Sequence, residues 1–84
     1  MDQIYNSIIE ALIFSTDDPI SEADLIKAVK GIDGEDTEIS SSDVENCVDE
    51  LNKSYEGNNI AFKITRVAGG FLFATKPEYA KYVG

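Results

Sequence analysis

The residues from Ile60 to Lys76 constrain the fold most, because their alternation of apolar and polar side chains is typical of a β-hairpin. The pair Gly69-Gly70 accepts the positive φ angles of a type I′ turn, so we place the two-residue loop there. This register predicts three facing pairs: Ala68 with Phe71, Arg66 with Phe73, and Ile64 with Thr75.

One face of this hairpin carries large apolar side chains, and the other face is mixed. A three-residue loop would slip the pairing by one residue and scatter the apolar groups over both faces. We therefore expect the apolar face to pack on the helices that precede the hairpin. The apolar face holds Ile60, Phe62, Ile64, Phe71 and Phe73; the other holds Ala61, Lys63, Thr65, Val67, Leu72, Ala74 and Lys76.

Three earlier segments show the apolar recurrence of amphipathic helices. They span 2–15, 21–31 and 42–57, and the last two open with possible capping boxes, Ser21 with Asp24 and Ser42 with Glu45. Lys30-Gly31 is expected to end the second helix, Ile20 to add a short strand to the hairpin, and Pro77 to begin another helix. This order predicts an α+β winged-helix fold with the third helix in the recognition position.

The first helix carries an apolar arc about 200° wide, whereas burial on one side needs only somewhat more than about 100°. Either a second molecule covers part of the arc, or a small core wraps the helix deeply. Two other candidate contact surfaces are the outer face of the hairpin and the C-terminal segment. The candidate interaction residues are therefore Ile4, Ile8, Ile9 and Ile13 on the helix, Val67 and Leu72 on the hairpin, and Tyr79 and Tyr82 at the end.

Composition excludes several kinds of site. The chain of 84 residues has one cysteine and no histidine, so it offers neither an internal disulfide nor a His/Cys zinc site. No apolar run approaches the roughly 18 residues of a membrane span, and the start lacks the basic flank of a signal peptide. We therefore expect one soluble cytoplasmic domain that needs no cofactor.

The sequence gives little support for a catalytic or metal-binding function. Cys47 lies beside apolar residues of the third helix and has no imidazole to activate it, so apolar filling is its expected role. The acidic loop 31–41 could suggest calcium, but Glu38 stands where an EF-hand begun at Asp33 needs glycine. We expect no catalytic, cofactor-binding or metal-binding residues.

Charge bears on nucleic acid as a partner. The formal net charge is -9, and the third helix presents several carboxylates against the single base Lys53, which opposes insertion among phosphates. A winged-helix transcriptional regulator that binds DNA is the alternative function. We expect no direct sequence-specific DNA binding, although weak contact through the hairpin stays open. The acids are Asp43, Glu45, Asp49, Glu50 and Glu56, and the bases of the hairpin and beyond are Lys63, Arg66, Lys76 and Lys81.

Several stretches together resemble the N-terminal domain of the segregation and condensation protein B family. They are Ile9-Glu10-Ala11-Leu12-Ile13-Phe14-Ser15, Pro19-Ile20-Ser21, Val67-Ala68-Gly69-Gly70-Phe71 and Thr75-Lys76-Pro77-Glu78-Tyr79-Ala80-Lys81-Tyr82-Val83. The resemblance covers nearly the whole chain except the acidic loop, which is longer than the resemblance would suggest.

The resemblance implies a function without catalysis. Proteins of this family are accessory subunits of prokaryotic condensin that dimerise and bind the kleisin, ScpA, which bridges the heads of the SMC ATPase. They act on the nucleoid in chromosome condensation and segregation. They hold two winged-helix domains, so 1–76 would be the first and 77–84 the start of a linker helix towards the second. Dimerisation is assigned mainly to the first domain and much of the kleisin contact to the second.

Overall fold

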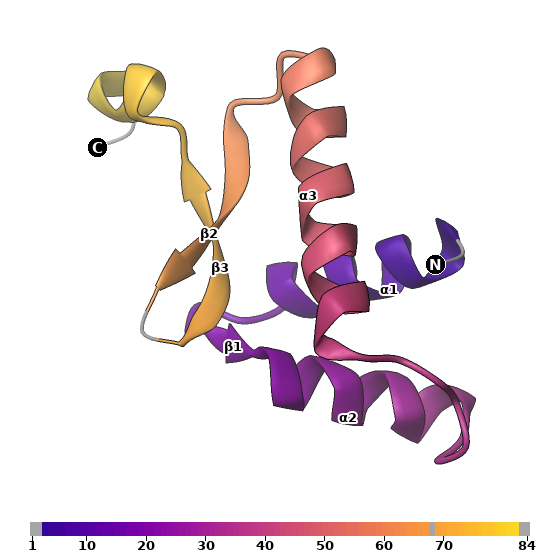
Figure 1. The fold of residues 1–84 in the computed structure, drawn as a ribbon. Coiled ribbons are helices and arrows are strands. Elements are labelled where there is room, and N and C mark those ends of the chain that lie inside the picture. Colours follow the sequence, from indigo (N-terminus) through magenta and orange to yellow (C-terminus); the bar gives the residue numbers. More distant parts are fainter. Residues whose placement is uncertain (1–2, 68, 83–84) are drawn as a thin grey trace.

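Three α-helices precede a β-hairpin in this computed structural model, which describes the main chain of residues 3–67 and 69–82 (Figure 1). The hairpin stands beside the length of α3, and α1 and α2 pack across the lower half of that helix. The arrangement confirms the predicted α+β winged-helix fold. The elements are α1 (Gln3–Phe14), β1 (Ile20–Ser21), α2 (Glu22–Asp33), α3 (Ser41–Gly57), β2 (Phe62–Val67), β3 (Gly70–Thr75) and the 3-10 helix η1 (Pro77–Tyr82).

The core lies where the three helices meet the inner face of the hairpin. Ile64 and Phe71 from the hairpin are buried there, as the alternation predicts. The outer end of the same face is not covered, because Phe62 is 49% exposed and Ile60 is 39% exposed. The helices contribute Ile9, Ile13, Leu25, Val29, Val44, Cys47, Val48 and Leu51 to the core.

The hairpin register differs from the prediction. Ile64 pairs with Phe73, Arg66 with Phe71, and Val67 with Gly70, so the loop lies one position earlier, at residues 68–69. Ala68, which was expected to face Phe71, lies outside the described residues. A shift of two in the pairing leaves each side chain on its predicted face, so the alternation could not detect it.

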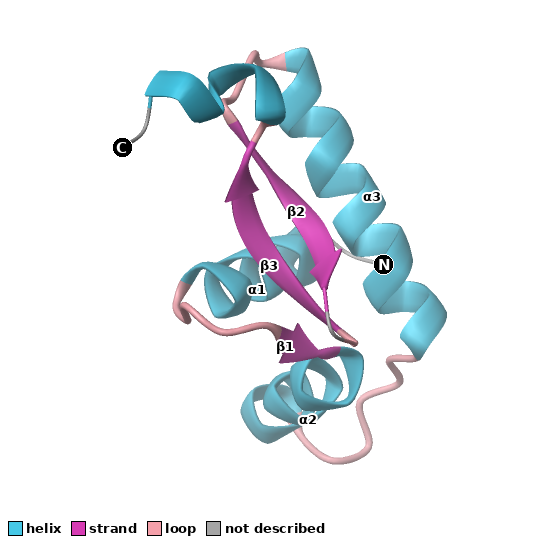
Figure 2. Cartoon of the chain, turned by 90° about the vertical axis from the view of Figure 1, so that its left-hand side faces the viewer, coloured by secondary structure: helices cyan, strands magenta, loops and turns pink. Residues whose placement is uncertain are grey.

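Gly70 belongs to β3 instead of the turn because β1 approaches it closely. The strand order is β1-β3-β2, and Ser21 of β1 pairs with Gly70, which confirms the short added strand (Figure 2). A Cβ atom at Gly70 would lie 3.0 Å from the carbonyl of Ile20 and from the side chain of Pro19. Glycine is therefore needed here for close backbone approach. Gly69 has φ of 77° and supplies the turn.

Two helix ends also lie away from their predicted positions. α2 runs through Gly31 and ends at Asp33, where Gly34 with φ of 113° donates its N–H to the carbonyl of Lys30 at 2.7 Å. The capping box of α3 is formed by Ser40 and Asp43, two residues before the predicted pair of Ser42 and Glu45.

Two predicted element starts are confirmed. Ser21 caps α2, with its hydroxyl accepting from the N–H of Asp24 at 3.1 Å. Pro77 opens the C-terminal helix as predicted, although the segment is a 3-10 helix, η1. It lies beyond the end of the hairpin that is far from α2 (Figure 2).

Candidate protein-interaction surface

An apolar groove of about 500 Å³ lies between the second half of α1, the end of α3 and the open end of the hairpin. Three large apolar side chains on its walls are exposed: Phe14 at 77%, Phe62 at 49% and Ile60 at 39%. Exposed apolar groups gathered in one place typically mark a binding site. The groove is lined by Glu10, Ala11, Phe14, Tyr55, Ile60, Phe62, Phe73, Ala74 and Thr75.

Aromatic contacts build the groove. The ring of Phe73 packs edge-to-face with Phe14, with centroids 5.7 Å apart, and is tilted against Tyr55 at 5.8 Å. The Tyr55 hydroxyl donates to the carboxylate of Glu10, and burial together with this hydrogen bond raises the pKa of Tyr55. Tyr55 therefore remains a donor at neutral pH, which satisfies the one carboxylate in the lining.

Among the seven candidate interaction residues whose side chains the structure describes, none lines this groove. Ile9 and Ile13 are fully buried in the core, so they cannot offer a contact surface. At these two residues the small core of the same chain covers the helix, which was one of the two explanations for the wide apolar arc. Ile8 is half-buried against the core, and the side chain of Ile4 lies outside the described part of the chain.

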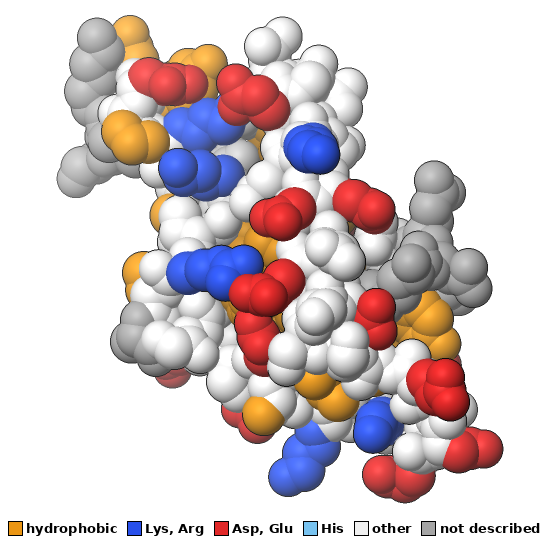
Figure 3. Space-filling model, viewed as in Figure 1, with side chains coloured by type: hydrophobic (Ala, Val, Ile, Leu, Met, Phe, Trp, Pro, Cys, Tyr) orange, Lys and Arg blue, Asp and Glu red, His pale blue; other side chains and the backbone are white. Residues whose placement is uncertain are grey.

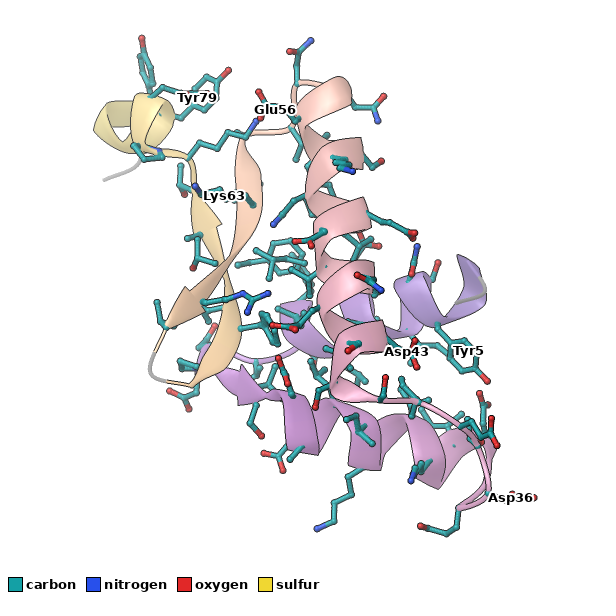
Figure 4. All side chains as sticks on the ribbon, viewed as in Figure 1. Tyr5, Asp36, Asp43, Glu56, Lys63 and Tyr79 are labelled. Carbon is teal, nitrogen blue, oxygen red and sulfur yellow. The ribbon has the colours of Figure 1, made fainter. Side chains whose placement is uncertain are left out.

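The other four candidates lie elsewhere on the molecule. Val67 is 39% exposed and Leu72 is half-buried on the outer face of the hairpin. Tyr79, labelled in Figure 4, is 36% exposed and Tyr82 is 73% exposed on η1. These side chains are accessible, so their role in contacts stays a prediction.

Sequence reasoning missed the groove because its parts come from four elements. Phe14 falls outside the apolar arc of α1, and such a displaced aromatic residue is a signal that could have been used. Ile60 and Phe62 were assigned to the packing face of the hairpin, but that face extends past the helices. Only the lengths of the packed elements show which end is left open.

Acidic and basic side chains lie close together on the face of the molecule that α3 and the hairpin share (Figure 3). Arg66 pairs with Glu45 at 2.5 Å, and Lys76 pairs with Glu56 at 2.6 Å. These hydrogen bonds raise the pKa of both bases and lower the pKa of Glu56. Lys76 is only 7% exposed, and Glu56 reaches it from the end of α3 (Figure 4). These two cations of the expected DNA footprint are therefore occupied within the domain.

Cys47 is buried in the core, and the acidic loop lies away from it on the surface. Cys47 is 1% exposed, and burial, with help from Glu50 and Glu10, raises the pKa of its thiol to about 11. The thiol is therefore protonated at neutral pH and packs as a small apolar group. Within residues 3–67 and 69–82, no three His, Cys, Asp or Glu side chains are placed to hold a metal ion. Asp36 and Asp43 lie apart, in the loop and at the start of α3 (Figure 4).

Among the helices of the described chain, none combines the length and the apolar character of a transmembrane span.

Two solved structures below 25% identity share the fold of this chain. A structure described as a dimer of the ScpB N-terminal domain complexed with a ScpA peptide has a TM-score of 0.76 at 23% identity, covering 96% of this chain and 91% of that one. The crystal structure of ScpB from Mycobacterium tuberculosis has a TM-score of 0.78 at 18% identity, covering 99% of this chain and 48% of that one.

A further solved structure is closer in sequence. It is a conserved hypothetical protein from Chlorobium tepidum, with a TM-score of 0.77 at 34% identity, covering 96% of this chain and 46% of that one.

Sequence relatives give the family. Segregation and condensation protein B of Bacillus cereus (strain AH187) is 36% identical over 77 residues, which are 90% of this chain and 36% of that protein. The protein of the same name from Symbiobacterium thermophilum is 30% identical over 76 residues, 90% of this chain and 31% of the relative. This chain therefore spans about a third of these relatives. The family model for the segregation and condensation complex subunit ScpB matches residues 7–84, so the chain belongs to the ScpB family.

Proposed function

We propose that this chain is the N-terminal domain of a non-catalytic accessory subunit of prokaryotic condensin. It acts in chromosome condensation and segregation by dimerising and by binding the kleisin ScpA, and through ScpA it joins the SMC ATPase on the nucleoid in the cytoplasm. The observation that carries this proposal is the groove walled by Phe14, Ile60 and Phe62, because an exposed apolar surface on a small domain favours a protein partner.

The charge distribution supports a protein partner over DNA. Arg66 and Lys76 are held by carboxylates of α3, and the helix in the recognition position presents acids along its length. Such a surface repels phosphates at short range and releases few counterions. No observation favours the alternative of a DNA-binding regulator.

Residues 1–76 form the first winged-helix domain in this proposal, and residues 77–84 begin the link to a second one. The exposed side chains of Val67, Tyr79 and Tyr82, with Leu72, remain candidates for dimer contacts. The solved ScpB N-terminal domain that shares this fold is described as a dimer, which supports this assignment.

The test is capture of ScpA by the full-length parent protein, combined with analytical ultracentrifugation of the parent. We expect ScpA to be retained and the parent to sediment as a dimer, and we expect Leu72→Asp to weaken the dimer. A monomer that fails to retain ScpA would refute the proposal. Sequence-specific, salt-sensitive binding to duplex DNA would instead support the regulator.

A further inference from the structure

The central strand of the sheet has an open edge beside the groove. β1 pairs only with Gly70 and Phe71 of β3. From Leu72 to Thr75, no other described residue pairs with β3 on the side of β1 (Figure 2). An open edge is a template on which an extended segment can add as a further strand.

The hydrogen bonds of the hairpin show which groups point to this edge. The side chain of Asn52 accepts from the N–H of Ile64 at 2.8 Å and donates to its carbonyl at 3.0 Å. The main-chain N–H and C=O of Ile64 therefore point away from β3, so Ile64 and Phe73 form a pair without main-chain hydrogen bonds between them. The bond from the N–H of Lys76 to the carbonyl of Ala61, at 2.8 Å, fits the same alternation.

It follows that the N–H and C=O groups of Phe73 and Thr75 point away from β2, towards the open edge. Phe71 has the same phase in β3, and it is the residue that pairs with Ile20 of β1. The outward main-chain groups of Phe73 and Thr75 thus lie in line with those of Phe71, which pairs with β1, but no strand of the described chain pairs with them.

The groove lies directly under this edge, since Phe73 and Thr75 belong to its lining. An added strand would direct every second side chain to the inner face of the sheet, into the space bounded by Phe14. Main-chain hydrogen bonds to the edge and apolar side chains in the groove would then act together. A helix in the groove would leave the edge unused.

We propose that the edge of β3 at Phe73 and Thr75 binds an extended segment of the kleisin as an added strand. This inference rests on the function proposed above and names the site. The segment carries large apolar side chains at alternate positions and is flanked by Lys or Arg. Charge favours such a peptide over a second copy, because each copy has a net charge of -9 and Glu10 is the only charged side chain among the described residues that line the groove.

Amide hydrogen exchange measured by NMR tests this directly. The probes are overlapping peptides that tile the ScpA of the same organism, added to this chain. We expect the amides of Phe73 and Thr75 to exchange quickly in the free chain and to become at least about 10-fold slower with the binding peptide. The amides of Leu72 and Ala74, which bond to β2, are the internal control, because they are protected in both states.

Two variants give a second readout. Thr75→Pro removes an outward N–H while leaving the bonds between β2 and β3, and Phe14→Ser removes a wall of the groove that is 77% exposed. Each is expected to weaken the binding of the peptide by about 10-fold or more. Retained protection of Leu72 and Ala74 shows that the variants fold. The matched control is Ile32→Ser on α2, an apolar residue that is 64% exposed and lies outside the groove, and it is expected to bind like the wild type.

Three outcomes would contradict the inference that the kleisin segment adds to β3 as a strand. The peptide could bind while Phe73 and Thr75 keep exchanging, which would indicate a helix in the groove. Both amides could become protected with rising concentration of the chain alone, which would indicate a second copy. No peptide could protect them although the full-length parent captures ScpA, and then the inference fails while the proposed function stands. Failure of the parent to capture ScpA would instead refute the proposed function.

Discussion

At the scale of single residues, Asn52 holds the hairpin to α3. The side-chain amide of Asn52 bonds to both the N–H and the C=O of Ile64, on the side of β2 where no strand of the described chain pairs with it. Asn52→Ala would leave the N–H and C=O of Ile64 unpaired in a partly buried place. We expect a loss of about 2–3 kcal/mol in the free energy of unfolding, measured with urea.

The control for this change is Asn58→Ala. The side-chain amide of Asn58 donates to the carbonyl and the hydroxyl of Ser54 at the exposed end of α3, so a loss of about 0.5 kcal/mol is expected. Equal effects of the two substitutions would show that Asn52 does not fix the hairpin.

Two glycines should respond in opposite directions to alanine. Gly70→Ala would place a Cβ atom 3.0 Å from the main chain of Ile20, so β1 must move, at a cost of about 1–3 kcal/mol. Gly31 lies inside α2, and a Cβ atom there would have no atom from outside the helix backbone within 4 Å, so we expect Gly31→Ala to stabilise the chain by about 0.5–1 kcal/mol. Thermal unfolding of both variants measures this, and a stabilising Gly70→Ala would mean that β1 is not held against β3.

At the scale of elements, the sequence was enough to predict the order of the described helices and strands and the two faces of the hairpin, although not the 3-10 form of η1. It could not predict the register, because a shift of two residues preserves both faces and the choice depends on the contact of Gly70 with Ile20. Similarly, Gly31 and Gly34 both resemble helix ends, and tertiary packing decides between them. The groove was missed for the related reason that its walls belong to four elements.

The ion pair between Glu56 and Lys76 joins the end of α3 to the end of β3, and it predicts a pH dependence. The hydrogen bond of Lys76 lowers the pKa of Glu56 below its usual 4.5, so its contribution is present above pH 4.5 and is lost as the pH falls through the lower folded value. The pKa of Lys76 is raised above 10.5, so its contribution is present below pH 10.5 and is lost as the pH rises through the higher folded value.

Glu56→Gln should therefore destabilise the chain at neutral pH, and its difference from the wild type should shrink below pH 4.5. Urea unfolding across the acid range measures this difference. Glu35→Gln, in the exposed loop between α2 and α3, is the control and should show no such convergence. A difference that is independent of pH would mean that the substitution acts through something other than this pair.

At the scale of the whole molecule, sixteen acids and seven bases share a body with a radius of gyration of 13.2 Å. This radius is close to the Debye length of about 10 Å at 0.1 M salt, so at lower salt most like charges repel one another without screening. Two of the seven bases are paired with two acids of α3, which leaves 14 acids against 5 bases on the rest of the molecule and the same excess of nine acids.

We therefore expect the urea midpoint to rise between about 10 mM and about 150 mM NaCl, because screening relieves this repulsion in the folded state more than in the expanded unfolded chain. KCl should act equally if the effect is screening. Arg66→Gln removes one ion pair and adds to the acid excess, so its midpoint should rise more steeply with salt. A midpoint that falls with salt would show that the pairs with α3 outweigh the general repulsion, and the charge argument against a second copy in the groove would then lose its basis.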